Sequence, residues 1–159
     1  MKLDAYNGKK AEFIISGDKL FVKSFDASND TFSLFRHTVT NGVVSAAEML
    51  DTSIKACNII DADVWYRRSV TGSSLCDLYK YSAEKEKIDG DVASFAGLSD
   101  GSVLIVKNFV SSSDGEIADL YLYDGKKTSL VAEKAELKNM KYSDKYILYT
   151  QRRRFMYLF

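Results

Sequence analysis

Short apolar runs alternate with polar turn residues along the whole chain, in a pattern that predicts β-strands. The runs are rich in valine, isoleucine, tyrosine and phenylalanine, which favour pleated sheets, and most are too short for a helix. Asp, Gly and Ser separate the runs, and these residues favour turns because they accept left-handed backbone or bind their own main chain. A helical turn is an alternative only at residues 45–50. The pattern therefore predicts an all-β protein of antiparallel strands.

An aromatic motif recurs four times and divides the pattern into repeats. It consists of Leu or Met, an aromatic residue, any residue, and then an aromatic residue or His. The copies are Leu34–His37, Leu78–Tyr81, Leu120–Tyr123 and Met156–Phe159. A β-branched or aromatic run precedes each copy, and a turn that contains Asp precedes each run. Each repeat is therefore predicted to contain a strand, an Asp turn, a strand, a polar loop, an aromatic strand and a variable fourth strand.

The predicted first strands set the boundaries of the repeats. They cover approximately residues 11–15, 54–60, 93–98 and 136–142, and the fourth strands cover approximately residues 43–49, 84–88 and 128–133. We divide the single domain 1–159 into units near 11–53, 54–92, 93–135 and 136–159, with residues 1–10 as a candidate closing strand. A period of about 40–45 residues with four strands per unit is typical of β-propeller blades. The prediction is a β-propeller-like fold of about four antiparallel β-meander units, either a small closed ring or an incomplete propeller.

Two interpretations of the segment before the first unit stay open. Residues 2–6 are strand-like and would supply the missing fourth strand of the last unit by pairing with Phe155–Phe159, which closes the ring and removes exposed sheet edges. Residues 3–10 also match Leu120–Lys127 at five of eight positions, which fits a chain cut from a longer propeller. We favour closure.

The third repeat resembles a known family. Ser99-Asp100-Gly101 and the run Leu-Tyr-x-Tyr-Asp-Gly-Lys at residues 120–126 resemble the WD-like repeats of bacterial Tol-type propellers and related bacterial propeller domains. The Trp-Asp dipeptide of eukaryotic WD repeats is missing, because Trp65 is followed by Tyr66. The resemblance implies a binding or scaffolding module, and some propellers of this kind accompany a hydrolase domain.

Composition limits the partners. Because 22 Lys and Arg residues balance 22 Asp and Glu residues, no net field attracts nucleic acid, and none is expected as a partner. The chain lacks both the ~20-residue apolar run of a membrane helix and the apolar core of a signal peptide, so we expect no membrane span and a soluble chain.

Cys57 and Cys76 are too few for a disulfide framework, and two buried free thiols are favoured over a pair.

The sequence shows no pattern typical of catalytic or metal sites. His37, the single histidine, stands where other repeats have an aromatic residue, so we interpret it as a structural replacement rather than a catalytic base. One histidine and two distant cysteines do not form a zinc site, and the carboxylates lack the spacing of an EF-hand. The carboxylate clusters, which we assign to loops, are Asp26–Asp30, Asp61–Asp63, Asp89–Asp91 and Asp114–Asp119. We predict no enzyme activity, no metal and no cofactor.

Basic residues after the second strand form the candidate binding site. Lys23, Arg67 and Lys107 stand at corresponding places in three units, and Arg152 and Arg154 follow in the fourth. Corresponding positions of a propeller form a ring about its axis, and a basic rim would bind an acidic peptide, a glycan or a phosphate group. The alternative is that these residues mark solvent-facing strand positions.

The predicted function is a non-enzymatic module that binds a protein or peptide or acts as a scaffold. Two alternatives stay open: an accessory propeller domain of a hydrolase, and a half-ring that assembles by oligomerisation into a homo-oligomer. An aromatic stripe would stack sugars or bases or, as we favour, pack between units. The stripe consists of Phe35, Tyr79, Tyr121 and Tyr157.

Overall fold

The computed structural model describes residues 6, 10–26, 30–113, 115–142, 147–151 and 154–158. These residues form one antiparallel sheet of 13 strands whose order follows the chain, except that β4 lies off this path and pairs with β3, which confirms the predicted all-β meander. The strands are β1 (Ala11–Ser16), β2 (Lys19–Asp26), β3 (Thr31–Thr40), β4 (Val43–Val44), β5 (Glu48–Ile60), β6 (Asp63–Ser69), β7 (Cys76–Tyr81), β8 (Lys85–Gly97), β9 (Val103–Ser112), β10 (Gly115–Tyr123), β11 (Thr128–Tyr142), β12 (Ile147–Gln151) and β13 (Arg154–Leu158).

Three long strands run from one unit into the next without a break. β5 pairs with β3 through residues 48–54 and with β6 through residues 54–60, so it ends the first unit and begins the second. β8 and β11 change partner in the same way at Val92 and Ala135. The separate fourth and first strands that we predicted are therefore fused. Residues 43–49 are also not one strand, because β4 ends at Val44 and β5 begins at Glu48, and no helical turn forms there.

A left-handed residue precedes each change of partner. Ser53, Asp91 and Lys134 have φ angles of 57°, 58° and 52°. In each of the three units, the pairing of the aromatic strand with the long strand shifts register before and after the motif leucine, as it does at a β-bulge. A bulge inserts an extra residue that bends the strand, and the bend lets one strand serve two units. Five aspartates that we assigned to loops lie in strands β2, β6, β8 and β10 instead: Asp26, Asp63, Asp89, Asp91 and Asp119.

Asp119 connects two bulges of the third unit. Its Oδ1 accepts the Lys134 amide at 2.8 Å, and its Oδ2 accepts the Asn108 side-chain amide at 2.7 Å. Asn108 is also left-handed, with a φ of 50°. The hydrogen bond from Asn108, followed by that from the Lys134 amide, lowers the pKa of the Asp119 carboxyl below its ordinary value. The ionised carboxylate therefore stabilises both bends.

Each unit has a forward face toward the next unit and a backward face toward the preceding one. Phe21 and Leu34 on the forward face of the first unit cluster with Val64 and Tyr66 on the backward face of the second. Two further clusters repeat this arrangement at the next boundaries. The second contains Ile60, Trp65, Leu78, Val103, Ile105 and Tyr123, and the third contains Leu104, Leu120, Ala132, Ala135, Ile147 and Tyr149. The core is therefore a series of layers between units.

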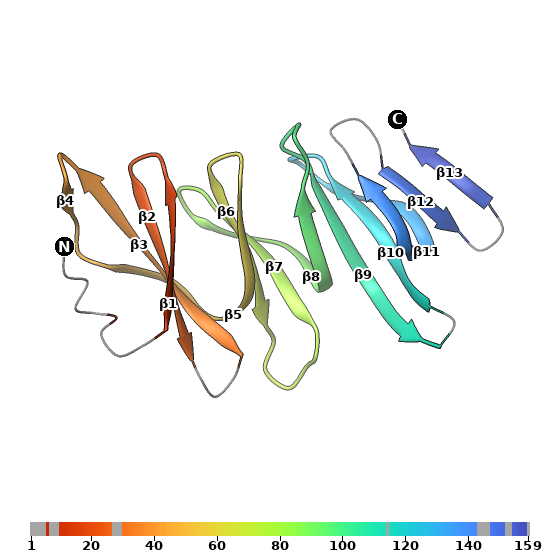
Figure 1. Cartoon of the computed structure of the whole chain (residues 1–159), viewed down its shortest axis with the longest axis horizontal. Coiled ribbons are helices and arrows are strands. Elements are labelled where there is room, and N and C mark those ends of the chain that lie inside the picture. The colour runs from red at the N-terminus through yellow and green to blue at the C-terminus, as the bar shows by residue number, and fades with distance from the viewer. Residues whose placement is uncertain are drawn as a thin grey trace.

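The sheet is not closed. Within the described residues, β1 and β13 each pair with one neighbour, and Figure 1 shows them toward opposite ends of the molecule. The closed ring that we favoured is therefore wrong for this structure. Tyr6 is the one described residue of segment 2–6, and the rest of that segment lies outside the described residues. Tyr6 packs on the first unit, 5.3 Å from the Phe35 ring, where it buries its own ring.

The left-handed backbone at Ser53 predicts how substitutions there act. Ser53 is exposed, so a change of side chain acts mainly through the backbone. We expect Ser53→Val to lower the free energy of unfolding by about 1–2 kcal/mol, because a β-branched residue resists positive φ, and Ser53→Gly to leave it nearly unchanged. Urea unfolding followed by Trp65 fluorescence measures this. Thr52→Val is the control with ordinary φ, and an equal loss in the two valine variants would contradict the assignment.

The Asp119 bridge predicts a pH dependence. Because the folded-state pKa is lowered, the carboxylate contributes stability above its unfolded pKa, and this contribution is lost as pH falls through the folded pKa. We expect Asp119→Asn to reduce the free energy of unfolding by about 1 kcal/mol at pH 7. The difference from the parent chain should shrink when both are unfolded in urea at pH 3. A difference that is constant with pH would show that the charge is not involved.

Candidate functional site

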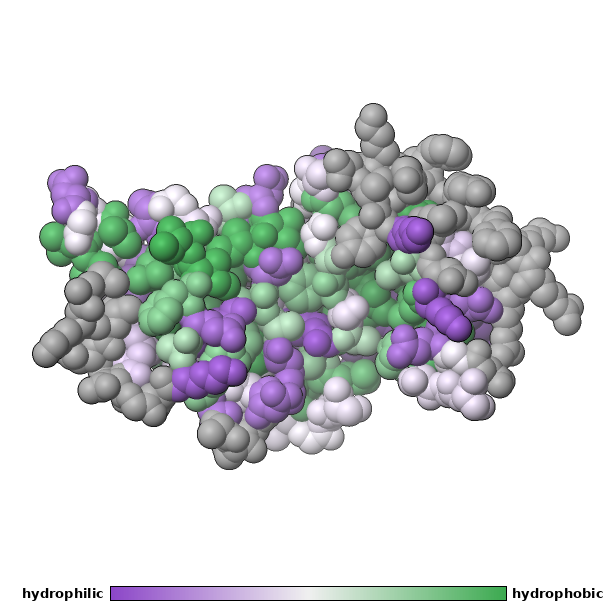
Figure 2. Space-filling model, viewed as in Figure 1, coloured by the Kyte–Doolittle hydropathy of each residue, from purple (hydrophilic) through white to green (hydrophobic). Residues whose placement is uncertain are grey.

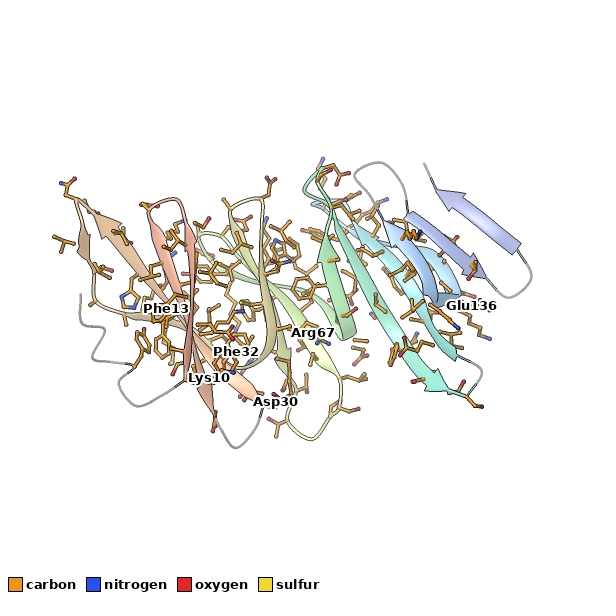
Figure 3. All side chains as sticks on the ribbon, viewed as in Figure 1. Lys10, Phe13, Asp30, Phe32, Arg67 and Glu136 are labelled. Carbon is orange, nitrogen blue, oxygen red and sulfur yellow. The ribbon has the colours of Figure 1, made fainter. Side chains whose placement is uncertain are left out.

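The described residues of the predicted basic rim have internal partners. Lys23 lies 3.5 Å from the Glu12 carboxylate, with 17% of its side chain exposed. Arg67 donates to the main-chain oxygen of Ala93, between the second and third units, and Figure 3 labels it there. Arg152 lies outside the described residues, and only the backbone of Arg154, in β13, is described.

Lys107 does not continue the row of Lys23 and Arg67. Lys23 pairs with the motif leucine Leu34, and Arg67 pairs with the corresponding Leu78, but Lys107 pairs with Asp119. Lys107 is therefore one residue further along its strand than we predicted. A shift of one residue turns a side chain to the other face of the sheet. Lys23 and Arg67 lie on forward faces, whereas Lys107 lies on a backward face and binds Asp89.

Two aspartates occupy equivalent positions in the first two units. Asp51 faces Leu34 in the ladder, and Asp89 faces Leu78. In the third unit, Ala132 faces the corresponding leucine. Sequence reasoning missed this equivalence because Asp51 stood outside the aspartate clusters and Asp89 was assigned to a loop.

The Asp51 carboxylate lies at the centre of a polar cluster between the first and second units. It accepts hydrogen bonds from Tyr66 Oη at 3.1 Å and from Lys85 Nζ at 2.6 Å, and Arg68 Nε lies 3.4 Å away. The Asp51 side chain is only 8% exposed. Burial, together with the Asp51 charge, raises the pKa of the Tyr66 phenol, so Tyr66 stays protonated and donates. The cluster fixes the two units against each other.

The next boundary contains a smaller version of this contact. Lys107 Nζ donates to Asp89 Oδ1 at 2.8 Å. Lys107 and Arg68 are equivalent by register, because they pair with Asp119 and Asp77. At two successive boundaries, a carboxylate of one unit therefore meets a cation on the backward face of the next. With Ala132 in place of the aspartate, the third boundary is apolar at this position.

His37 has a structural role within the first unit. It pairs with Leu20, as Tyr81 pairs with Val64 in the second unit, and its side chain is buried. Because the Ser45 carbonyl 2.9 Å away only accepts, Nδ1 carries the proton and Nε2 accepts the Tyr6 hydroxyl at 2.9 Å. Both ring nitrogens therefore have internal partners.

The two thiols are free in the structure. Cys76 is buried and Cys57 is half-buried. Burial raises the pKa of the Cys57 thiol, which disfavours the reactive thiolate. Within the described part of the chain, no three His, Cys, Asp or Glu side chains gather in a way that would hold a metal ion. No helix there has the length and apolar character needed to cross a membrane.

A groove of about 320 Å³ lies between the turns that begin the second and third units. Residues 58–61, 97–99 and 101 line it. Gly97 allows the close approach of these two units, because a Cβ atom there would lie 2.7 Å from the Ile60 side chain. The groove follows from the packing of two units.

The backward face of the first unit exposes apolar side chains. Phe13 pairs with Val22, Val22 with Phe35, and Phe35 with Met49, and paired residues share a face of the sheet. Ile15 lies beside this row on β1. Phe13, Ile15 and Met49 are 54%, 77% and 60% exposed, while Val22 is fully buried. We define Phe13, Ile15, Val22, Phe35 and Met49 as the end face.

The figures locate the end face. Figure 3 labels Phe13 and Phe32 on opposite sides of the first-unit strands, with Phe32 toward the second unit. In Figure 2, hydrophobic surface is most extensive over the half of the molecule that contains β1 to β6. The end face is the candidate functional site, because an exposed apolar patch of this kind typically marks an interaction surface.

Comparisons with known proteins identify the fold. No family model matches the sequence, and no curated protein is a significant match. The structure is similar to that of the β-propeller domain of the Trilobed protease from Pyrococcus furiosus, described as having an open velcro topology, with a TM-score of 0.60 and 14% identity. The similarity covers 87% of this chain and 48% of that chain, so the chain spans about half of its structural neighbour. The β-propeller type of fold is thereby confirmed.

The Asp51 cluster predicts strong coupling between units. We expect Asp51→Ala to lower the free energy of unfolding by about 2 kcal/mol, because it leaves the buried Tyr66 hydroxyl and the Lys85 ammonium without this acceptor and removes the charge beside Arg68, and Tyr66→Phe to lower it by about 1 kcal/mol. The double variant should lose less stability than the sum of the two single losses, since both changes remove the same hydrogen bond between Tyr66 and Asp51. Urea unfolding of the four chains gives the coupling energy, and strict additivity would contradict the contact.

Proposed function

We propose that the chain is a non-enzymatic scaffolding module of propeller type that binds a protein or peptide through its end face. The observation that carries the proposal is the exposure of Phe13 and Ile15 at positions where other units are covered. By register, Cys57 and Phe95 correspond to Phe13, and Ile59 corresponds to Ile15. These three counterparts are only partly exposed, because each packs against the preceding unit.

The physical chemistry of the end face favours a protein partner. Burial of apolar surface stabilises a complex by roughly 25 cal/mol for each Å² that leaves water. Phe13 and Ile15 are held by the ladder between β1 and β2, so little conformational entropy is lost when they are covered. The face also borders β1, which is an edge strand of the sheet among the described residues and can add a strand from a partner.

The charged clusters support a scaffolding role. The carboxylates of Asp51 and Asp89 and the cations of Arg68, Lys85 and Lys107 bind one another across unit boundaries. Their chemistry is thus used to fix the stack of units. We assign the repeats to the WD-like type of bacterial Tol-type propellers, on the motif at residues 120–126 and the propeller fold of the chain.

A display experiment tests the proposed binding surface. The chain is immobilised at low density and used to select peptides from a random display library, and the selected peptides are titrated by fluorescence anisotropy. We expect Phe13→Glu and Met49→Glu each to weaken binding about 10-fold or more, because a charge enters the buried centre of the contact. Val110→Glu is the matched control, since Val110 is 51% exposed but lies on β9. Peptides that bind all variants equally would contradict the proposal.

An accessory role beside a hydrolase is the second candidate. The observation that favours it is the structural neighbour, a propeller domain of a protease. In this case the module would bind unfolded polypeptide and deliver it to a catalytic domain. Titration with a reduced, carboxymethylated protein and with the same protein in its native state separates the two functions. Preferential binding of the unfolded form favours the accessory role, and equal or absent binding contradicts it.

A further inference from the structure

We propose that the groove between the second and third units binds a primary alkylammonium group, such as the end of a lysine side chain, with the Asp61 carboxylate as its charged acceptor. This site goes beyond the proposed function, because the groove contains no residue of the end face.

The groove lies between two turns on the same side of the molecule. Residues 58–61 come from the end of β5 and the turn into β6, and residues 97–99 and 101 come from the end of β8 and the turn into β9. Figure 1 shows both turns at the top of the molecule. The volume of about 320 Å³ is at the lower limit of small-molecule sites, so the groove fits a short side chain or a small amine.

Two glycines of the third unit hold the walls of the groove close together. Because Gly97 has no side chain, Ile60 packs against it and is only 7% exposed. A Cβ atom at Gly101 would lie 2.8 Å from Oδ2 of Asp61, so the carboxylate of the second unit reaches the turn of the third. The acceptor is therefore in place before a ligand arrives, which reduces the conformational entropy lost on binding.

The Asp61 carboxylate is the one acidic group among the residues that line the groove, and it has no internal partner. Within the described part of the chain, it takes part in no hydrogen bond and no ion pair. Asp63, two residues further on, differs in this respect, because Lys80 Nζ lies 2.8 Å from its carboxylate. The groove itself is lined by no lysine or arginine. Its negative charge is thus available to a cation from outside.

The turn does not need this carboxylate. Asp100 and Asp124 each accept the main-chain amide two residues further on at 2.9 Å, which is the usual role of aspartate in a turn. Asp61 accepts no such amide. By register it corresponds to Gly17 of the first unit, and the two residues have similar φ angles of 54° and 58°. A glycine therefore suffices to form the turn, and the Asp61 side chain is left for another task.

The other polar groups of the groove suit a donor with several N–H bonds. Ser99 contributes a hydroxyl that has no partner among the described residues. Asn58 Oδ1 accepts the Ile59 amide at 2.9 Å and has a second lone pair. An ammonium group carries three donors and no acceptor, so it can use these oxygens together with the Asp61 carboxylate. A calcium ion needs six to eight oxygen ligands, more than these side chains supply.

The apolar lining favours an alkyl chain behind the charge. Ile60 and Leu98 line the same groove. Lysine side chains commonly lay their methylene groups along such apolar surface while the ammonium group stays with water and acceptors. We therefore assign the groove to an alkylammonium and not to a small inorganic cation.

An NMR titration tests the inference. Amide correlation spectra of the chain are recorded with increasing n-butylammonium chloride, and with sodium chloride or tetramethylammonium chloride at the same concentrations. We expect the amide signals of residues 58–61 and 97–101 to shift and to saturate in the millimolar range, because an exposed ion pair is weak. Tetramethylammonium should bind about 10-fold more weakly, since it has the charge but no N–H donor.

Asp61→Asn removes the charge and keeps the turn, because asparagine accepts left-handed backbone as aspartate does. We expect this variant to keep the melting temperature of the parent chain and to raise the dissociation constant of n-butylammonium about 10-fold. Asp18→Asn is the matched control, since it removes an exposed carboxylate from the turn between β1 and β2. It should bind the amine as the parent does. Phe13→Glu, on the end face, should also leave amine binding unchanged, so this test is independent of the proposed function.

Two sources of the ammonium group are compared in the same titration. Tighter binding of an acetylated and amidated tripeptide with a central lysine than of n-butylammonium would assign the groove to a lysine of a polypeptide. The reverse order would assign it to a free amine.

Three results would overturn the inference. The first is a set of shifts that sodium chloride reproduces, which would indicate an adventitious ion only. The second is equal affinity of the parent chain and Asp61→Asn for n-butylammonium. The third is tighter binding of calcium than of the amine at the same residues, which would replace the alkylammonium site with a metal site.

Discussion

A four-strand sheet has two faces, and a unit of about 40 residues contains no second layer to cover them. Every other feature of this structure depends on that constraint. Leu34 and Leu78 are completely buried only because the next unit packs on their faces. Stability in such an array comes from neighbouring contacts, and a single unit is not stable alone. The end face is the corresponding apolar surface of the first unit, where Phe13 and Ile15 are exposed.

The bent strands connect successive units, and the aspartates align them. Ser53, Asp91 and Lys134 bend the long strands, so that the chain leaves one unit and enters the next without a loop. The bends alone do not determine how two units are aligned. Asp51 and Asp89 add this alignment, because a buried carboxylate is tolerated only where its cation and hydroxyl partners meet it.

The repeat and the strand class follow from local sequence. The aromatic motif and the Asp turns sufficed to predict the all-β meander, because alternation and turn preference act over few residues. The fused strands did not follow, since Ser53 and Lys134 are not residues that typically signal left-handed backbone. Closure also failed, because the position of Tyr6 depends on a tertiary contact with Phe35 and His37.

For the candidate site, too, local sequence predicted the strands but not the contacts that depend on the tertiary structure. The position of Lys107 was misjudged by one residue, because equivalence is set by pairing with the aromatic strand and not by distance from the preceding turn. Phe13 and Ile15 were recognised as strand residues, but their exposure is a property of the tertiary structure that alternation along the chain does not reveal. Strand order equals chain order throughout the path from β1 to β13 apart from β4, which pairs beside β3. Each strand can therefore find its partner as soon as it is synthesised, so the chain can fold progressively from its N-terminal side during translation.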